Sequence, residues 1–378
     1  MQTFRTALRF IRYDRTKSIG IIIGILISTF LIGQQLGIFT FLTGLMGSFA
    51  SNSNADIWVV DRKTKDVNQM GKFDIRVLSE IKSLPDVKSA SPLVLAGGTA
   101  TTPEGNTSNI LLVGSEAPAF AIGPDPTKIV EGNRNDLLTD GAVTTDLFDD
   151  NNFGKEMKLG SRFEINGKEA FVAVRTRNLR GFGASQVFTT IDRARFYGNI
   201  PATSIQAVLV NVTDPAKADA VIQSINDRFP NLRAWKKQKL AYSSIRVILS
   251  SSGIASSTGT LIIFALITGI LIIGLTMYSS VLDRLKDYGT MKAIGANFRY
   301  LTRLLLCQAM IFAITGFVLA WILLEIFRLA VVSTGLVITY QWYEIAGIFV
   351  ITSTISVGGM FFALLRLRNV EPASVFRN

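Results

Sequence analysis

Residues Ile254–Leu282 read IASSTGTLIIFALITGILIIGLTMYSSVL, a run of apolar and small side chains that contains no charged residue. Similar apolar runs occupy Ile19–Phe49, Leu304–Val332 and Ile345–Leu365. Each run exceeds the roughly 20 residues that a helix needs to cross a hydrocarbon layer of ~30 Å. Because backbone N–H and C=O groups cannot remain unpaired in lipid, the four runs are predicted to be transmembrane helices.

A polar block, residues 50–238, separates the first apolar run from the second. Strand-like segments occur near both of its ends, at Asp56–Val60 and Ser204–Val212, and the latter precedes a helical pattern at Pro215–Phe229. The fold class predicted is therefore an α-helical membrane protein with four transmembrane helices. A large α/β periplasmic domain is inserted between helices 1 and 2.

Basic residues set the predicted orientation. The chain has a net charge of +11, and three clusters of basic residues flank the apolar runs: Arg5, Arg9, Arg12, Arg15 and Lys17; Arg284, Lys286, Lys292, Arg299 and Arg303; Arg366, Arg368 and Arg377. Residues 331–344 contain no Lys or Arg. Since Lys and Arg mark the cytoplasmic side, both termini are expected inside and the large domain outside. With a single cysteine the chain can form no internal disulfide, and an exported domain without disulfides fits a bacterial envelope, so a bacterial inner membrane is expected. Nucleic-acid binding is disfavoured by this placement.

The expected division of the chain follows from these patterns. It comprises a cytoplasmic amphipathic helix (1–17), transmembrane helix 1 with a stalk (18–49), the periplasmic domain (50–238), a stalk with transmembrane helix 2 (239–282), a cytoplasmic coupling helix (283–301), transmembrane helix 3 (302–332), a short periplasmic loop (333–343), transmembrane helix 4 (344–366) and a cytoplasmic tail (367–378). Within the domain, residues 50–115 and 200–238 are expected to form a core lobe and residues 116–199 an insertion lobe.

Two stalks are expected beside the membrane. A single helix over Ile19–Phe49 would reach about 45 Å, which is longer than the bilayer requires. Lys239–Ser252, if helical, continues the second span outward. The small residues of Ser250–Gly253 and Ser256–Gly259 permit close helix packing, including an interface between two copies of the chain.

The residues for catalysis are largely lacking. The sequence has no histidine, its one cysteine is Cys307, and it has no G-x-x-x-x-G-K-[ST] phosphate loop. The carboxylate pairs Asp149-Asp150 and Asp136/Asp140 are interpreted as solvated surface groups rather than a metal site. We therefore predict a non-catalytic chain with no metal or cofactor of its own.

The informative segment follows the second apolar run. It reads DRLKDYGTMKAIGAN from Asp283 to Asn297, with Leu285, Met291, Ala293 and Ile294 set among charged residues. Glycines 289 and 295 are expected to break the helix on either side. So short a helix cannot bury its apolar side chains by itself, and it therefore needs a partner surface or the membrane interface.

Here the chain resembles the MacB/FtsX superfamily of ABC-transporter permeases. The resemblance rests on the M-K-A-I-G-A sequence of Met291–Ala296, on Asp287-Tyr288-Gly289 before it, and on Arg368–Ala373 near the C-terminus. The four-span layout agrees, and Ala7–Ser18 (ALRFIRYDRTKS) with the lack of a fused ATPase domain looks most like the DevC branch.

The resemblance implies a permease homodimer that binds two copies of a separate ATPase subunit, which carries the ATP and Mg. The implied ATPase-coupling residues are Arg284, Lys286, Asp287, Tyr288, Gly289, Met291, Lys292, Ala293, Ile294, Gly295 and Ala296. ATP-driven movement would be relayed to the periplasmic domains, with export of a lipid-like or hydrophobic substrate, as in glycolipid export. A periplasmic adaptor, an outer-membrane channel and membrane lipid are the further partners implied.

Two alternatives stay open within the superfamily. One is lipoprotein release, as in LolC- and LolE-like permeases. The other is transmembrane activation of a cell-wall hydrolase, as in FtsX, although FtsX-like proteins usually carry a smaller outer domain. A membrane-anchored enzyme is disfavoured by the absence of histidine and of a nucleophile–base pair.

Overall fold

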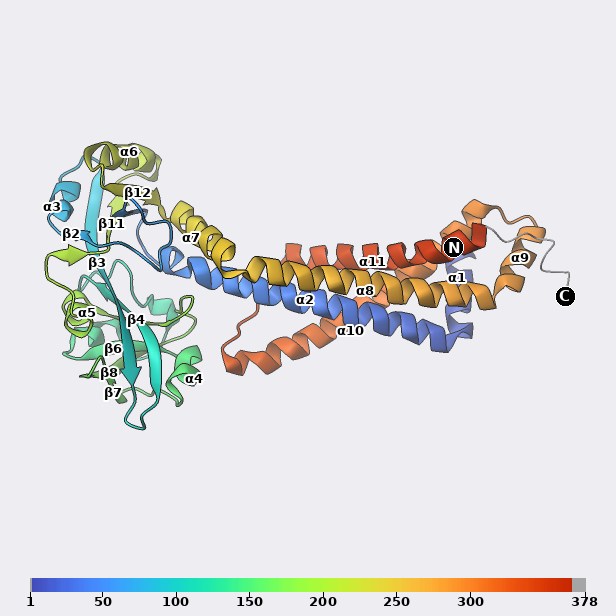
Figure 1. Ribbon diagram of the computed structural model, residues 1–378, viewed down its shortest axis with the longest axis horizontal. Coiled ribbons are helices and arrows are strands. Elements are labelled where there is room, and N and C mark those ends of the chain that lie inside the picture. Colours follow the sequence, from blue (N-terminus) through green and yellow to red (C-terminus); the bar gives the residue numbers. More distant parts are fainter. Residues whose placement is uncertain (1, 369–378) are drawn as a thin grey trace. The chain divides into compact units, whose positions relative to one another are not determined.

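The computed structural model describes residues 2–368 of the chain, which form two compact units (Figure 1). The first comprises the residues up to Phe41, Ile254–Val332 and the residues from Leu336 onward; the second comprises Leu42–Gly253 and Ser333–Gly335. Met1 and most of the predicted tail, including all but the first residue of the closing Arg368–Ala373 motif, lie outside the described residues.

Among its described residues, the regular elements of the first unit are all helices. Its elements are α1 (Gln2–Tyr13), the first part of α2 (Arg15–Ser51), α8 (Ile254–Asp283), α9 (Leu285–Ala293), α10 (Phe298–Val331) and α11 (Trp342–Arg368). The segments long and apolar enough to cross a membrane are Arg15–Ser51, Ile254–Asp283, Phe298–Thr334 and Trp342–Leu365. The four predicted helices are thereby confirmed as helices of spanning length.

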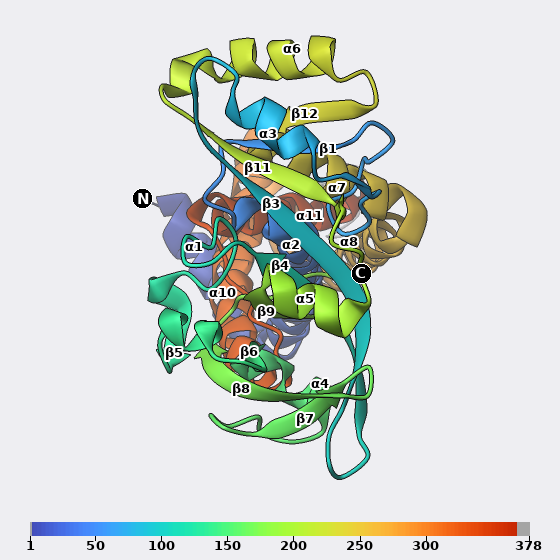
Figure 2. The ribbon, with the colours of Figure 1, turned by 90° about the vertical axis from the view of Figure 1, so that its left-hand side faces the viewer.

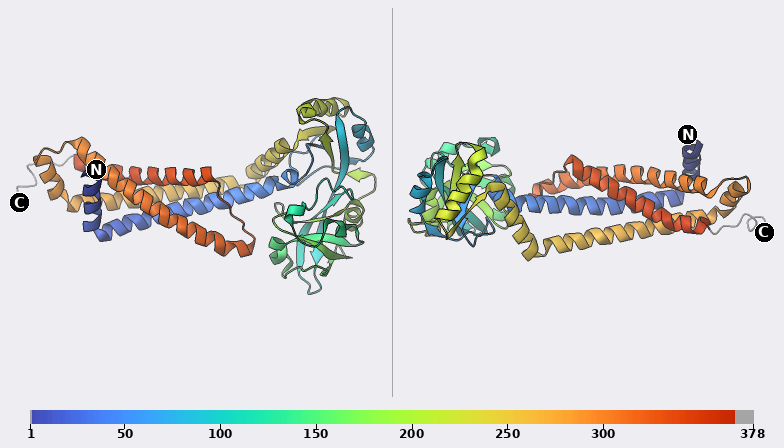
Figure 3. Two further views of the ribbon diagram at one scale, coloured as in Figure 1. Left: turned by 180° about the vertical axis from the view of Figure 1, so that it is seen from behind. Right: turned by 90° about the horizontal axis from the view of Figure 1, so that it is seen from above.

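Small residues bring pairs of these helices close together, and Figure 3 shows where α11 crosses α8. A Cβ placed on Gly359 of α11 would lie 2.5 Å from Ile273 Cγ2 of α8, and one on Gly316 of α10 would lie 2.4 Å from Ile25 Cγ2 of α2. Hydrogen bonds add to this packing: Thr29 and Thr352 share one at 3.0 Å. Such close backbone approach compensates for the absence of a hydrophobic driving force between helices in lipid.

Both predicted stalk segments are helical. Helix α2 runs unbroken from Arg15 to Ser51, which agrees with the single long helix expected over the first apolar run. Helix α7 (Lys237–Ser252) precedes α8. However, α7 and α8 are separate helices, because Gly253 between them has a left-handed φ of 69°. A residue without Cβ adopts this conformation at little cost, so the helical segment predicted before the second span is a helix of its own.

The second unit is an α/β domain built on one sheet of ten strands. Its strands are β1 (Ile57–Asp61), β3 (Val87–Thr101), β4 (Thr107–Ser115), β5 (Ile129–Glu131), β6 (Ala142–Asp146), β7 (Arg162–Ile165), β8 (Lys168–Thr176), β9 (Ser185–Thr190), β11 (Ala207–Val212) and β12 (Leu232–Lys236). A separate pair joins β2 (Phe73–Asp74) to β10 (Ser204–Ile205). The helices are α3 (Val77–Lys82), α4 (Asp150–Phe153), α5 (Ile191–Gly198), α6 (Ala218–Arg228) and α7; short 3₁₀ turns lie at Pro126–Lys128, Arg134–Leu138, Leu147–Asp149, Pro215–Lys217 and Val332–Thr334.

The two ends of the predicted polar block meet in this sheet. Strand β1 pairs antiparallel with both β11 and β12, with Trp58 opposite Leu209 and Trp235. Strand β3 then pairs with β11 and with β4 (Figure 2). The strands predicted from each end are therefore confirmed, and residues from both ends share one apolar cluster that includes Ile57, Val210 and Ile225.

The carboxylates at 149 and 150 are not solvated surface groups, contrary to the expectation from sequence. Asp149 is 4% exposed and lies 3.6 Å from Arg180, while Asp150 receives hydrogen bonds of 2.7 and 2.8 Å from the buried Arg175. Burial raises the pKa of Asp149 to about 6, although the Arg180 charge opposes the shift. Cations from β8 and from the segment after it thus compensate these charges within the fold.

Candidate functional site

The segment after α8 forms a short helix with a defined start and end. Helix α9 covers Leu285–Ala293, with Arg284 at its N-cap position. At the other end, the Gly295 N–H donates to Lys292 O at 3.1 Å and the Ala296 N–H donates to Met291 O at 2.9 Å. With Gly295 at a φ of 102°, these bonds form a Schellman motif, which terminates the helix.

Of the two predicted helix breaks, only the one at Gly295 is present. Gly289 lies inside α9 and is buried, so the expectation of a break there is wrong. A glycine in a helix interior costs only about 1 kcal/mol relative to alanine, which the packing of a buried face can offset. Gly289 therefore belongs to the packed face of the helix together with its neighbour Tyr288.

Tyr288 fixes the buried face of α9. Its side chain is 2% exposed, and its ring centroid lies 5.6 Å from that of Phe10 in α1. Burial raises the pKa of the Tyr288 hydroxyl to about 12, although the positive charge of Arg284 opposes the shift. Helix α9 is thus packed against both α1 and α10 through one aromatic side chain.

Arg284 makes the second connection to α1. Its side chain lies at the junction of α8 and α9, and the residue is 7% exposed. The guanidinium carbon lies 4.8 Å from the ring centroids of both Phe10 and Tyr13. A cation at this distance from two aromatic faces is attracted by both ring quadrupoles, so Arg284 holds α1 against the start of α9.

The opposite face of α9 and its C-terminal turn face away from the helix bundle. Ile294 is 82% exposed, and the predicted coupling residues Lys286, Asp287, Ala293 and Gly295 are exposed as well. Met291 and Ala296 are half-buried against the apolar core of the first unit. Lys292, also half-buried, donates from Nζ to Leu367 O of α11 at 3.1 Å. The predicted residues therefore divide into an anchoring set and an exposed set.

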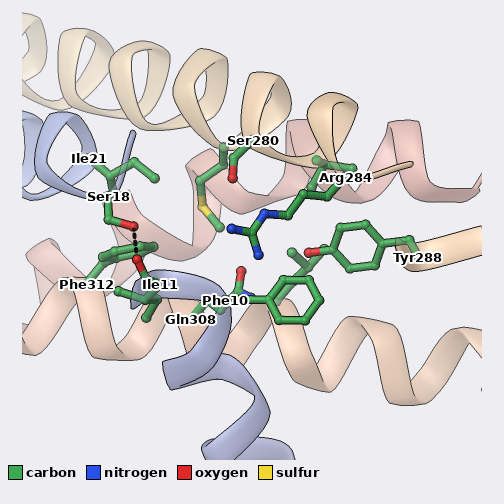
Figure 4. Close-up of a pocket in the computed structure, with 12 residues that line it drawn as sticks. Phe10, Ile11, Ser18, Ile21, Ser280, Arg284, Tyr288, Gln308 and Phe312 are labelled. Carbon is green, nitrogen blue, oxygen red and sulfur yellow. Dashed lines mark hydrogen bonds between the residues drawn. The ribbon is translucent and has the colours of Figure 1, made fainter. Parts of the chain in front are cut away.

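A small pocket lies behind α9, within the first unit (Figure 4). Its volume is about 20 Å³, and it is lined by Phe10, Ile11, Ser18, Ile21, Met277, Ser280, Val281, Arg284, Tyr288, Leu305, Gln308 and Phe312. The Arg284 guanidinium points into the space between Ser280, Phe10 and Gln308. Sequence reasoning did not identify Phe10, Tyr13 or Gln308, although a glutamine within an apolar run was a signal that could have been read.

Comparison with known proteins gives two family matches. Residues 18–228 match the MacB-like periplasmic core domain, and residues 259–372 match the FtsX-like permease C-terminal family. No curated protein sequence matches the chain.

Similar solved structures cover about half of the chain. The extracellular domain of the noncanonic ABC-type transporter YknZ from Gram-positive bacteria is 14% identical, with a TM-score of 0.36, and the match covers 48% of this chain and 99% of that one. The periplasmic region of MacB from Actinobacillus actinomycetemcomitans is 10% identical, with a TM-score of 0.38, and the match covers 52% of this chain and 94% of that one.

Proposed function

Since the chain belongs to the MacB/FtsX superfamily of ABC-transporter permeases, we propose that it converts ATP hydrolysis on a separate ATPase subunit into movement of its α/β domain. In this proposal α9 is the coupling helix that receives the ATPase. The α/β domain lies in the periplasm, both termini are cytoplasmic, and the membrane is the bacterial inner membrane. The ATPase subunit supplies the ATP and Mg.

The observation that carries this proposal is the two-faced character of α9. One face is fixed to α1 and α10 by Tyr288 and Arg284, while Ile294 stands 82% exposed beside a rigid Schellman turn. An isolated helix of this length is only marginally stable in water, so the packing of its buried face keeps the whole helix folded, including its exposed face. An exposed aliphatic side chain on a braced helix suits it for insertion into a groove on a partner protein.

We further propose a DevC-type role: a homodimeric permease that acts with a periplasmic adaptor and an outer-membrane channel to export a lipid-like or hydrophobic molecule, as in glycolipid export. The support for this finer assignment is the resemblance at Ala7–Ser18. Copurification from native membranes, with mass spectrometry of bound proteins and lipids, tests it. Recovery of a lipoprotein chaperone or a cell-wall hydrolase in place of an adaptor would contradict it.

The coupling role is tested by the substitution Ile294→Glu. We expect it to abolish copurification of the ATPase subunit from native membranes and to remove permease-dependent stimulation of ATP hydrolysis. The change introduces a charge at an exposed position, so folding should be preserved. Gly295→Pro is a second variant, because proline cannot adopt a φ of 102° and removes the N–H that bonds to Lys292 O.

Leu138→Glu is the matched control. Like Ile294, Leu138 is an exposed aliphatic side chain (52% exposed), but it belongs to the α/β domain rather than to α9. The control should retain ATPase recovery and stimulation. If Ile294→Glu and Gly295→Pro retained both properties as fully as Leu138→Glu does, α9 would not be the ATPase-binding element.

A further inference from the structure

The pocket behind α9 contains hydrogen-bond donors that have no acceptor. The Nη2 atom of Arg284 and the Nε2 atom of Gln308 are buried and have no hydrogen-bond partner among the described residues. Both side chains line the pocket, and both residues are 7% exposed. Buried polar groups nearly always have a partner, so two orphaned donors at one cavity indicate that something else occupies it.

The lining of the pocket has a positive electrostatic character. Arg284 is its one charged residue, and neither Asp nor Glu occurs among the lining residues. In the part of the chain that the structure describes, no carboxylate oxygen forms an ion pair with Arg284 within 4.0 Å. The faces of Phe10 and Tyr13 offset part of this charge, but they accept no conventional hydrogen bond from Nη2.

Two acidic groups at the ends of α1 and α8 have other partners. The Asp14 carboxylate accepts a hydrogen bond from Ser280 Oγ at 3.4 Å, and the Asp283 carboxylate is paired with Lys17. The Ser18 hydroxyl donates to Ile11 O at 3.0 Å. No acceptor among the described residues lies within hydrogen-bonding distance of Arg284 Nη2 or Gln308 Nε2, so a partner from outside the chain would satisfy both donors.

The size of the pocket limits that acceptor to one atom. A cavity must offer at least about 10–15 Å³ to hold one water molecule, and this pocket offers about 20 Å³. A monoatomic anion of similar size fits, whereas a whole phosphate or carboxylate group does not. One oxygen of a phosphate could enter while the rest of its lipid remains outside the pocket.

We propose that this pocket is an anion site, in which Arg284 and Gln308 bind a single anionic atom: a chloride ion, or one phosphate oxygen of a membrane lipid. A neutral water could accept from both donors, but it would leave the buried guanidinium without a counter-charge, which is the costlier state. The bound anion would join α1, the α8–α9 junction and α10 at one point. Its binding would therefore stabilise the packed position of α9.

The test uses the full chain, purified in a neutral detergent free of lipid. Thermal unfolding is measured while sodium chloride or bromide replaces sodium gluconate at constant ionic strength, because gluconate is a bulky, strongly hydrated anion that cannot enter the pocket whole. A second arm, in gluconate alone, compares added phosphatidylglycerol with phosphatidylcholine at equal amounts. The matched variants are Arg284→Gln, Gln308→Leu, and Arg299→Gln as an exposed arginine outside the pocket.

A halide source predicts a saturable rise of the unfolding temperature with chloride or bromide. The halide concentration that gives half of the full effect should rise by about tenfold or more in Arg284→Gln and in Gln308→Leu, because each change removes one donor. It should stay unchanged in Arg299→Gln. Asp14→Asn should preserve the response, since that carboxylate is not the occupant. Crystals grown in bromide should show anomalous density between Arg284 Nη2 and Gln308 Nε2.

A lipid source predicts instead that phosphatidylglycerol alone raises the unfolding temperature, with the same dependence on Arg284 and Gln308. If Arg284→Gln does not fold, Gln308→Leu carries both arms by itself. A flat response in both arms, or an equal response in wild type and Gln308→Leu, would overturn the anion site and leave only a bound water.

Discussion

The contact between α8 and α11 can be tested at two neighbouring glycines. A Cβ on Gly359 would lie 2.5 Å from Ile273 Cγ2, 2.8 Å from Ile273 Cβ and 3.0 Å from the backbone nitrogen of Gly274. A Cβ on Gly358 would find its nearest neighbour, Ile270 Cγ1, at 3.6 Å. The first position is too close for any side chain, whereas the second offers ordinary van der Waals contact.

The magnitude follows from this difference. Both Gly→Ala changes gain the same intrinsic helix propensity, about 1 kcal/mol, so that contribution cancels in the comparison. Overpacking of a close contact costs about 1–3 kcal/mol, and the backbone atom of Gly274 cannot move aside as a flexible side chain could. Gly359→Ala should therefore be less stable than Gly358→Ala by about 1–3 kcal/mol.

The protein carries its own reporter for this measurement. Cys307, the one cysteine in the sequence, is half-buried in α10, so a thiol-reactive fluorogenic dye should label it as the helices separate. Labelling during heating in detergent gives an unfolding midpoint for each variant. Equal midpoints for the two variants, or a higher one for Gly359→Ala, would refute the close approach of α8 and α11.

The remaining predictions concern the α/β domain and the helix junction. Because the pKa of Asp149 is raised to about 6 in the fold from 3.8, folding favours its protonated form. The contribution of Asp149 to the free energy of unfolding should then be most favourable below pH 4 and fall by about 3 kcal/mol in total as the pH rises through 6 to about 7. Asp149→Asn, compared with the wild type by denaturant titration at each pH, should lose this part of the slope. Arg175→Met should lower the free energy of unfolding by about 3–5 kcal/mol, because it leaves the Asp150 carboxylate without its bidentate partner. The control Arg162→Met, at an exposed ion pair, should lower it by less than about 1 kcal/mol. Equal losses in denaturant titrations would contradict the buried pairing. Gly253→Ala should cost about 1–2 kcal/mol in the Cys307 labelling assay, because alanine at a φ of 69° is strained, and an unchanged midpoint would show that this position is not left-handed.

The long helices were predictable because hydrophobicity over about 20 residues is a local property of the sequence. The residues at which these helices begin and end were less predictable, because hydrogen bonds from capping side chains determine them. Helix α10 begins at Phe298, before the apolar run that starts at Leu304, since the Asn297 side chain accepts from the Tyr300 N–H at 2.9 Å. Hydrophobicity alone does not report this bond.

The strands at the two ends of the α/β domain were predictable for a similar reason, since Ile57–Asp61 and Ala207–Val212 are short, mainly apolar segments rich in β-branched residues. The buried carboxylates were not. An Asp-Asp pair between turns is usually solvated, and its burial here depends on Arg175 and Arg180, which are supplied by the fold rather than by the neighbouring sequence. Ion pairs distant in sequence leave no local pattern.

The coupling segment illustrates the same division between local and distant information. Its sequence predicted a short helix whose apolar side chains need a partner surface. In α9, Met291 packs against the core of the first unit, whereas Ile294 is exposed. The sequence did not show what holds this helix, because Tyr288 and Arg284 pack on Phe10 and Tyr13 near the start of the chain. A helix as short as α9 is marginal alone, so its shape depends on that contact.

This dependence gives a physical reason for the resemblance at Ala7–Ser18. The stretch supplies Phe10, Tyr13 and Ser18, which surround Arg284 and the pocket behind α9. Substitutions there would loosen α9 without touching its exposed face. In the proposed mechanism, force applied at Ile294 reaches the long helices only while Tyr288 and Arg284 remain seated. Helix α1 is therefore expected to be part of the coupling apparatus rather than a topology signal alone.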